Sequence, residues 1–105
     1  MHDFRGKTYK QICEALGVES LRGTDLRGAD FYGTDLRGAN LRWAYFLGAD
    51  LEGADFRGAD LRWAIFRGAN LRGANFYEAN LEGADFRGAK NIPDMLFNNN
   101  AILTR

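Results

Sequence analysis

The sequence contains few of the residues that form cross-links or carry covalent chemistry. Its 105 residues include one cysteine, one histidine, one serine and one proline. The single Cys13 excludes an intrachain disulfide and favours a reducing compartment, so we expect a cytoplasmic protein. No apolar run has the length of a membrane span or of the apolar part of a signal peptide, so we expect no membrane partner.

The sequence also lacks an excess of charge of one sign, because 14 basic residues balance 14 acidic ones. Nucleic-acid-binding proteins normally carry a basic excess, so we expect no nucleic-acid partner. Catalysis needs a nucleophile, an acid or base and a group that orients them, and zinc sites need clustered Cys and His ligands. The sequence shows neither set. We therefore expect no enzyme, no cofactor and no metal ion.

Glycine is abundant instead, and most of the 13 glycines recur every five residues. From residue 21 to residue 86 every fifth residue is Leu or Phe, followed two residues later by Gly except at Trp43, Trp63 and Glu78. From residue 24 onward, Ala or Thr stands two residues before each Leu or Phe. A helix repeats near 3.6 residues and a strand near 2, so each five residues must form one short extended segment and one turn. We expect the chain to coil, with the Leu or Phe and the small residue inside.

This pattern resembles the pentapeptide-repeat family, whose motif is A(D/N)LXX. The stretches Ala-Asp-Leu-Glu-Gly at 49–53 and Ala-Asn-Leu-Arg-Gly at 69–73 match it directly. The resemblance implies an all-β fold, a right-handed quadrilateral β-helix (a solenoid of pentapeptide repeats), over residues 20–90. We expect residues 1–19 to form an N-terminal cap with a capping α-helix, and residues 91–105 to form a short C-terminal cap or tail.

The order of Leu and Phe supports four sides. From Leu41 to Phe86 the two residue types alternate strictly, so equivalent positions recur every ten or twenty residues. The segments 41–44 and 61–64 are both Leu-Arg-Trp-Ala, which selects the interval of twenty. Stacking at that interval predicts Leu walls facing each other and Phe walls facing each other. The first coil departs from this order, with Phe31 on a Leu wall and Leu26 and Leu36 on Phe walls.

The N-terminal end of the repeat needs a cover, because an open coil exposes apolar side chains and unpaired backbone. Residues 8–11 have the form of a capping box, and Gly17 suits the end of a helix. Helical spacing of apolar side chains is seen at Tyr9, Ile12, Cys13 and Leu16. This helix either caps the first coil or binds a partner. Residues 3–6 resemble one repeat out of register, which we expect to lie against the helix.

At the C-terminal end the repeat stops after Ala89, and Pro93 is placed to open a short helix. The segment that follows contains too many apolar residues for a free tail: Met95, Leu96, Phe97, Ile102 and Leu103. It forms either a lid on the last coil or the contact of a homodimer, and the two are compatible.

Stacking at twenty also superposes charged residues, with Asp30 on Asp50 and Asp35 on Asp55. A cation can bridge such carboxylates, but neighbouring arginines neutralise them more simply. The arginines form columns of their own on three faces. We interpret them as a solvated surface of alternating charge, and the alternative is a track for anions or nucleic acid.

Five outward positions break the repeat and converge on one corner of the coil: Trp43, Tyr45, Leu47, Trp63 and Ile65. We expect an exposed apolar patch there, rimmed by Arg42, Arg62 and Arg67. Such patches on soluble proteins usually mark a contact, and Trp, Tyr and Arg dominate binding energies. The alternative is that one of the chain ends folds over this corner.

These features predict a non-enzymatic scaffold that binds an unknown protein partner, or a second copy of itself, through the corner or the C-terminal segment. The resemblance offers another function, because some pentapeptide-repeat proteins imitate duplex DNA and bind DNA gyrase, conferring quinolone resistance. The neutral charge and the short repeat argue against that function here. An enzyme would need a site built from Asp and Arg alone.

Overall fold

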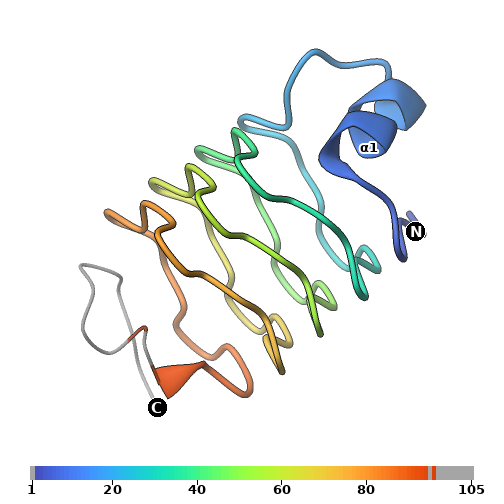
Figure 1. Ribbon diagram of the computed structural model, residues 1–105. Coiled ribbons are helices and arrows are strands. Elements are labelled where there is room, and N and C mark those ends of the chain that lie inside the picture. Colours follow the sequence, from blue (N-terminus) through green and yellow to red (C-terminus); the bar gives the residue numbers. More distant parts are fainter. Residues whose placement is uncertain (1, 95, 97–105) are drawn as a thin grey trace.

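The protein is a short rod of stacked coils with one helix at its N-terminal end (Figure 1). The computed structural model describes residues 2–94 and residue 96. The helix, α1, spans Tyr9–Leu16 and is the one α-helix in these residues. From Leu21 onward the chain winds regularly, and each pentapeptide contributes one side of the coil and one turn.

Adjacent coils are joined by parallel backbone bridges between residues twenty apart. Asp30 bridges Asp50, which in turn bridges Asn70. The N–H of Phe31 donates to the carbonyl of Asp50 at 2.8 Å, and the N–H of Asp50 donates to the carbonyl of Ala29 at 3.0 Å. The interval of twenty confirms four pentapeptides per coil. Throughout the described residues these bridges are isolated, so each wall of the solenoid is held by single bridges and not by longer strands.

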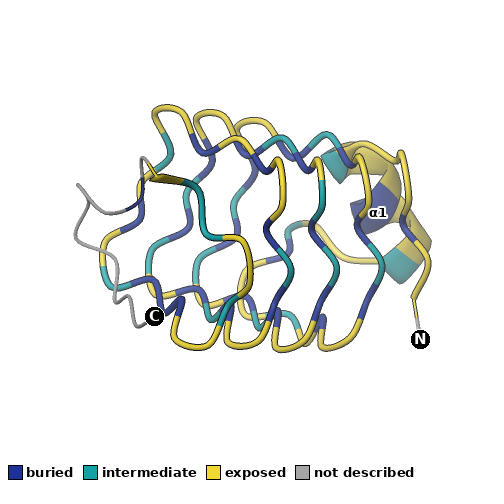
Figure 2. Ribbon diagram, turned by 90° about the horizontal axis from the view of Figure 1, so that it is seen from below, coloured by how far each residue is buried: buried dark blue, intermediate teal, exposed yellow. Residues whose placement is uncertain are grey.

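The interior of the coil is filled by the Leu and Phe of every repeat, each at most 3% exposed. Figure 2 shows the buried segments recurring from coil to coil. Phe46, Phe66 and Phe86 stack with ring centroids 4.9 and 4.6 Å apart, and Phe56 stacks on Phe76 at 4.8 Å. The two Phe walls meet edge to face. Burying each of these side chains contributes about 1.5–3 kcal/mol, so the predicted walls are the main source of stability.

The first coil exchanges residues between walls, as the sequence predicts. Phe31 lies on a Leu wall, and its ring reaches Phe46 on the neighbouring wall at 5.4 Å and Phe4 at 5.3 Å. All three rings are buried. The exchange therefore connects the N-terminal segment to the Phe stack.

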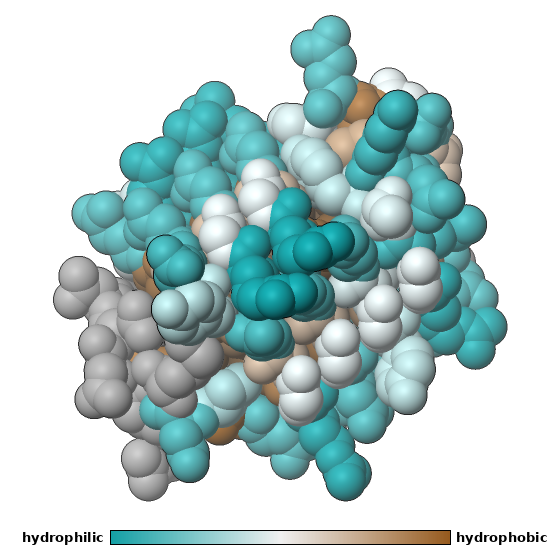
Figure 3. All heavy atoms as spheres, viewed as in Figure 1, coloured by the Kyte–Doolittle hydropathy of each residue, from teal (hydrophilic) through white to brown (hydrophobic). Residues whose placement is uncertain are grey.

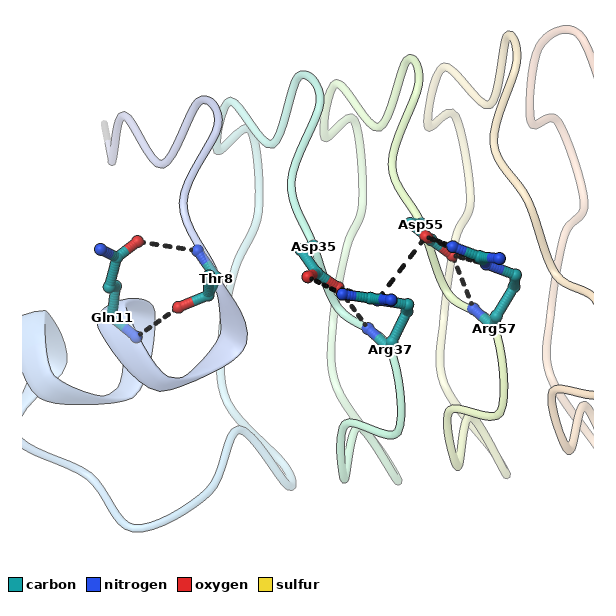
Figure 4. Close-up of polar contacts among 6 residues, drawn as sticks. All are labelled: Thr8, Gln11, Asp35, Arg37, Asp55 and Arg57. Atoms are coloured by element: carbon teal, nitrogen blue, oxygen red, sulfur yellow. Dashed lines mark hydrogen bonds and ion pairs between the residues drawn. The ribbon is translucent and has the colours of Figure 1, made fainter.

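The predicted helix and its boundaries are confirmed in α1. The backbone N–H of Gln11 donates to the Thr8 hydroxyl at 3.2 Å, and the Gln11 side chain accepts from the Thr8 N–H at 2.9 Å (Figure 4). Gly17 ends the helix in the left-handed conformation. Ile12 and Cys13 are buried against the first coil, and burial raises the pKa of the Cys13 thiol.

Residues 3–6 differ from the prediction, because they do not simply lie against the helix. They form one more side of the coil: Asp3 bridges Asp30, and the N–H of Phe4 donates to the Asp30 carbonyl at 2.8 Å. The interval is 27 residues because α1 is inserted between this segment and Leu21. The segment is thus out of register in sequence and in register in space.

The regular coil ends at Asn91, which adopts a positive φ of 57°. Leu96 then lies fully buried in the core, and Ile92 packs partly against it. The predicted apolar residues Met95, Phe97, Ile102 and Leu103 fall outside the described residues. Within the part of the chain that is described, no helix has the length and apolarity needed to cross a membrane.

Candidate functional site

The corners of the coil require a left-handed backbone at the last residue of each pentapeptide. Glycine occupies almost all of these positions, with φ near +64° to +72°. Trp43 and Trp63 take the same conformation, with φ of 61° and 63°. A residue with a Cβ atom pays roughly 1–2 kcal/mol for this conformation, so both tryptophans sit where the backbone disfavours them.

The two tryptophans form a stack on the outside of one corner. Their rings are 5.6 Å apart between centroids and inclined by 15°. Trp43 is 52% exposed and Trp63 43% exposed, so residues described elsewhere in the chain do not cover them. Below them, the Trp63 ring lies directly over Gly83: a Cβ atom at Gly83 would overlap the Cε3 and Cζ3 atoms of Trp63.

The three aliphatic and aromatic neighbours predicted for this patch lie on the adjoining side of the coil. Tyr45 bridges Ile65, and both are only partly exposed, which makes them less accessible than predicted. Arg27 covers the Tyr45 ring, with its Cζ 5.5 Å from the ring centroid. Leu47 is 38% exposed and borders an open depression of about 590 Å³. The exposed part of the patch is therefore the tryptophan pair together with Leu47. We call Trp43, Tyr45, Leu47, Trp63 and Ile65 the aromatic corner.

The arginines around the aromatic corner differ in their pairing. Arg62 contacts the carboxylate of Asp60 at 2.8 Å, and Arg42 reaches the same carboxylate at 3.5 Å. Arg67 makes no ion pair with any described residue, because Ile65 stands where most repeats have Asp or Asn. It remains exposed beside the patch.

Elsewhere on the coil, Asp and Arg of the same pentapeptide pair with each other. Arg37 contacts Asp35 at 2.8 Å and Arg57 contacts Asp55 at 2.7 Å (Figure 4). Arg37 also approaches Asp55 of the next coil at 3.9 Å. Hydrogen bonds from these arginines hold the pKa of Asp35 and Asp55 below the ordinary value.

Of the stacked carboxylates that the sequence suggested as a cation site, Asp35 and Asp55 are paired with arginine, and Asp30 lies 3.5 Å from Arg5. Asp50 has no arginine partner among the described residues and accepts from the Asn70 side chain at 3.5 Å. No group of three or more potential metal ligands occurs in the residues that the structure describes. The face seen in Figure 3 is mostly hydrophilic, which agrees with the interpretation of the arginine columns as a solvated surface.

Sequence reasoning missed Gly83 as part of this surface. Gly83 follows the repeat pattern, so its residue type does not distinguish it. Its position could have identified it, because it lies twenty residues after Trp63, where a residue without a side chain leaves room for the Trp63 ring. The hydroxyl of Tyr9 was also missed: it accepts from the Leu21 N–H and donates to the Asn40 carbonyl, both at 3.2 Å, and so fastens α1 to the first coil.

The repeat pattern and the coil geometry now agree with a known family. A family model described as pentapeptide repeats matches residues 20–53, 36–73 and 54–90. The chain belongs to the pentapeptide repeat family. Its right-handed sense is the one that the family resemblance implies. Among proteins with curated descriptions, none matches this sequence.

Several solved pentapeptide repeat proteins are similar to this chain. One from Nostoc PCC 7120 is 34% identical, covering 98% of this chain and 85% of its own, with a TM-score of 0.41. One from the thylakoid lumen of Arabidopsis thaliana is also 34% identical, covering 90% and 70%, with a TM-score of 0.33. QnrB1, a plasmid-mediated fluoroquinolone resistance protein, is 17% identical, covering 94% and 68%, with a TM-score of 0.40. At that identity no function carries over from QnrB1.

Proposed function

We propose that this pentapeptide repeat protein is a non-enzymatic scaffold that binds a protein partner through the aromatic corner. The observation that carries the proposal is the backbone conformation of Trp43 and Trp63. Both occupy left-handed corner positions, where glycine costs nothing and tryptophan costs roughly 1–2 kcal/mol. Strained residues of this kind cluster at functional sites, because folding alone does not favour them.

The arrangement of the pair also suits binding. Stacking restricts both rings before any partner arrives, so little side-chain entropy remains to be lost on association. Tryptophan and arginine are the residue types most enriched among those that dominate interface energies. Arg67, which makes no ion pair within 4 Å in the described residues although its charge acts on Asp85, lies exposed on the rim, where a partner's carboxylate can reach it.

In this scaffold we assign a capping role to the two ends. Ile12 and Cys13 of α1 are buried in the core, which supports a cap at the N-terminal end in preference to a helix that binds a partner through its apolar face. Burial of Leu96 supports a lid on the last coil. Thus α1 and Leu96 cover parts of the two ends, which leaves the sides and corners of the coil, together with the uncovered part of the first coil, as surfaces for contact. A second copy of the chain is the alternative partner.

The test is to replace Trp43 and Trp63 together by Gly, which restores the repeat pattern. We expect the unfolding free energy to stay the same or to rise, because relief of backbone strain offsets the lost aromatic pair, worth about 0.5–1.5 kcal/mol. We expect the association of the purified protein with its partner, or with itself, to be lost in titration calorimetry and light scattering.

A matched control replaces two other exposed aromatic residues, Tyr32 and Tyr77, by Arg. This variant should retain every association. If the tryptophan variant binds as the original protein does, or if the tyrosine variant loses binding equally, the corner is not the interface.

A further inference from the structure

The structure shows how an aromatic residue is held at this corner. The N–H of Trp63 donates to the carbonyl of Glu82 at 2.9 Å, and its ring covers the next residue, Gly83. A backbone carbonyl followed by a glycine thus forms a seat for an aromatic residue from the preceding coil. Trp43 repeats the backbone bond one coil earlier, donating to the carbonyl of Arg62 at 3.1 Å.

A backbone carbonyl followed by a glycine also occurs at the N-terminal end of this corner, where no aromatic residue of the described chain covers it. Arg22 and Gly23 correspond to Glu82 and Gly83, and Gly23 has the same left-handed φ of 67°. The carbonyl of Arg22 accepts no hydrogen bond from any described residue. Both residues are exposed, and nothing lies within 4 Å of a Cβ atom placed on Gly23. The seat therefore adjoins the end of the stack, beside Trp43, whose single aromatic neighbour in the described chain is Trp63.

The positive charge of Arg22 beside this seat also has no acidic partner among the described residues. Ser20 stands where most repeats have Asp or Asn, and the Arg22 side chain makes no ion pair with the described residues. Another part of the coil shows what fits there. Glu52 lies one coil before Arg72 at the equivalent position of its repeat, and the two approach to 4.0 Å. A glutamate placed one coil before Arg22 would face it in the same way.

We propose that Arg22 and Gly23 form a docking site for a Glu–aromatic dipeptide of a partner protein. The backbone N–H of the aromatic residue donates to the carbonyl of Arg22. Its ring covers Gly23 and extends the stack of Trp43 and Trp63. The glutamate that precedes it pairs with the Arg22 guanidinium. This inference rests on the proposed function, because it names the chemistry that the aromatic corner recognises.

A peptide fits these groups better than a nucleobase does. The seat presents a backbone carbonyl at the spacing of a coil-to-coil hydrogen bond, and Gly23 itself makes the next bond in that row, to Arg42 at 2.8 Å. A polypeptide supplies the N–H and the ring from one residue, as Trp63 does. The balanced charge of the chain also gives little attraction for a polyanion.

The sequence supplies its own probe, because Trp43 and Trp63 are its two tryptophans. We would titrate the full chain with the peptide acetyl-Gly-Glu-Phe-Gly-amide and follow tryptophan fluorescence. A saturable change is expected. Three altered peptides should each bind about tenfold more weakly: one with N-methyl-phenylalanine, which lacks the donor, one with lysine for glutamate, and one with alanine for phenylalanine.

Two protein variants test the seat from the other side. Gly23→Ala places a methyl group where the ring would lie and should abolish the fluorescence change. Gly38→Ala introduces the same left-handed strain, φ 64°, at a remote corner with open space around it, and should bind the peptide normally. Arg22→Gln should remove the preference for glutamate over lysine while retaining binding.

The outcomes separate this inference from the proposed function. Equal binding of the original and the N-methyl peptide, no saturable binding, or binding of adenosine monophosphate in preference to the peptide would each overturn the docking site. A fluorescence change that follows protein concentration without peptide would assign the seat to a second copy, and would also overturn it. If in any of these cases the double tryptophan-to-glycine variant still loses partner association, the proposed function stands.

Discussion

Two opposite corners of the coil have the same backbone and different surfaces. The corner of Gly33, Gly53 and Gly73 repeats glycine, with φ between 64° and 69°. The corner that begins at Gly23 and ends at Gly83 carries Trp43 and Trp63 between them, at nearly the same φ. Hydrogen bonds between coils have similar lengths at both, 2.9 Å from Gly33 and 3.1 Å from Trp43.

This comparison shows that the fold imposes the left-handed corner and that glycine merely adopts it most cheaply. Side chains at the corner do not enter the core, so they change the outer surface and leave the coil intact. In this chain the corner residues therefore differ without a change in the interior. Substitutions in the interior should therefore have the same effect on stability beside both corners, whereas substitutions on the outer surface should have different effects at the two corners.

The largest effect is expected inside, where the corners do not differ. Ala54 and Ala64 follow the corner residues Gly53 and Trp63, and both are 0% exposed. Enlarging either to Leu should lower the unfolding free energy by about 1–3 kcal/mol through overpacking. Chemical denaturation of Ala54→Leu and Ala64→Leu measures the loss. A loss at one corner only would show that the two interiors are not equivalent.

A smaller effect should distinguish the two exteriors. Gly73→Ala meets no atom closer than 3.8 Å, so it costs about 1–2 kcal/mol from left-handed strain alone. Gly83→Ala carries the same strain and also displaces the Trp63 ring. We expect a further loss of about 0.5–1.5 kcal/mol, together with loss of the coupled near-ultraviolet circular dichroism of the tryptophan pair.

The dichroism separates the two causes in this second experiment. Gly73→Ala should leave the tryptophan signal unchanged, since its corner lies across the coil. Equal stability losses in both variants, with an unchanged tryptophan signal in Gly83→Ala, would mean that the ring does not rest on Gly83.

The smallest effect concerns the charged pairs, which flank both corners. Arginine hydrogen bonds lower the pKa of Asp3 to about 2 and also lower the pKa of Asp25, Asp35, Asp55, Asp60 and Asp85. Because these values lie below the ordinary 3.8, the pairs stabilise the fold above that pH, and this contribution is lost as the pH falls further. Thermal unfolding between about pH 6 and pH 2 should show the loss.

Salt and substitution sharpen this last prediction. The pairs are largely exposed, so the effect should be modest and should shrink at high ionic strength. Arg57→Gln should reduce the acid-dependent loss, because Asp55 then loses its closest partner. Stability that increases on acidification would contradict the assignment.

Sequence periodicity predicted the fold well because each inward position repeats. Alternation of Leu and Phe placed Phe46 on Phe66, and the capping box located the start of α1. The N-terminal side at Phe4 was not predicted, because an inserted helix changes the interval from 20 to 27 residues. No local pattern encodes that interval, since it depends on how α1 closes over the first coil.

At the aromatic corner, too, the sequence predicted some features and not others. Sequence placed Trp43 above Trp63, because it fixes the position of each residue on a coil of known length. It did not determine which way the rings incline or where the stack ends, and it predicted more exposure for Tyr45 and Ile65 than the structure shows.

By itself, then, the sequence determined the four-sided coil, its apolar walls and the residues that meet at each corner, because these follow from a repeat that every coil must satisfy. Tertiary structure alone decided that the Trp63 ring rests on Gly83 and that the carbonyl of Arg22 lies open beside Gly23. The physical reason is that side-chain direction and unpaired backbone groups depend on the neighbouring coil, and the first coil has a neighbour on some of its sides and not on others.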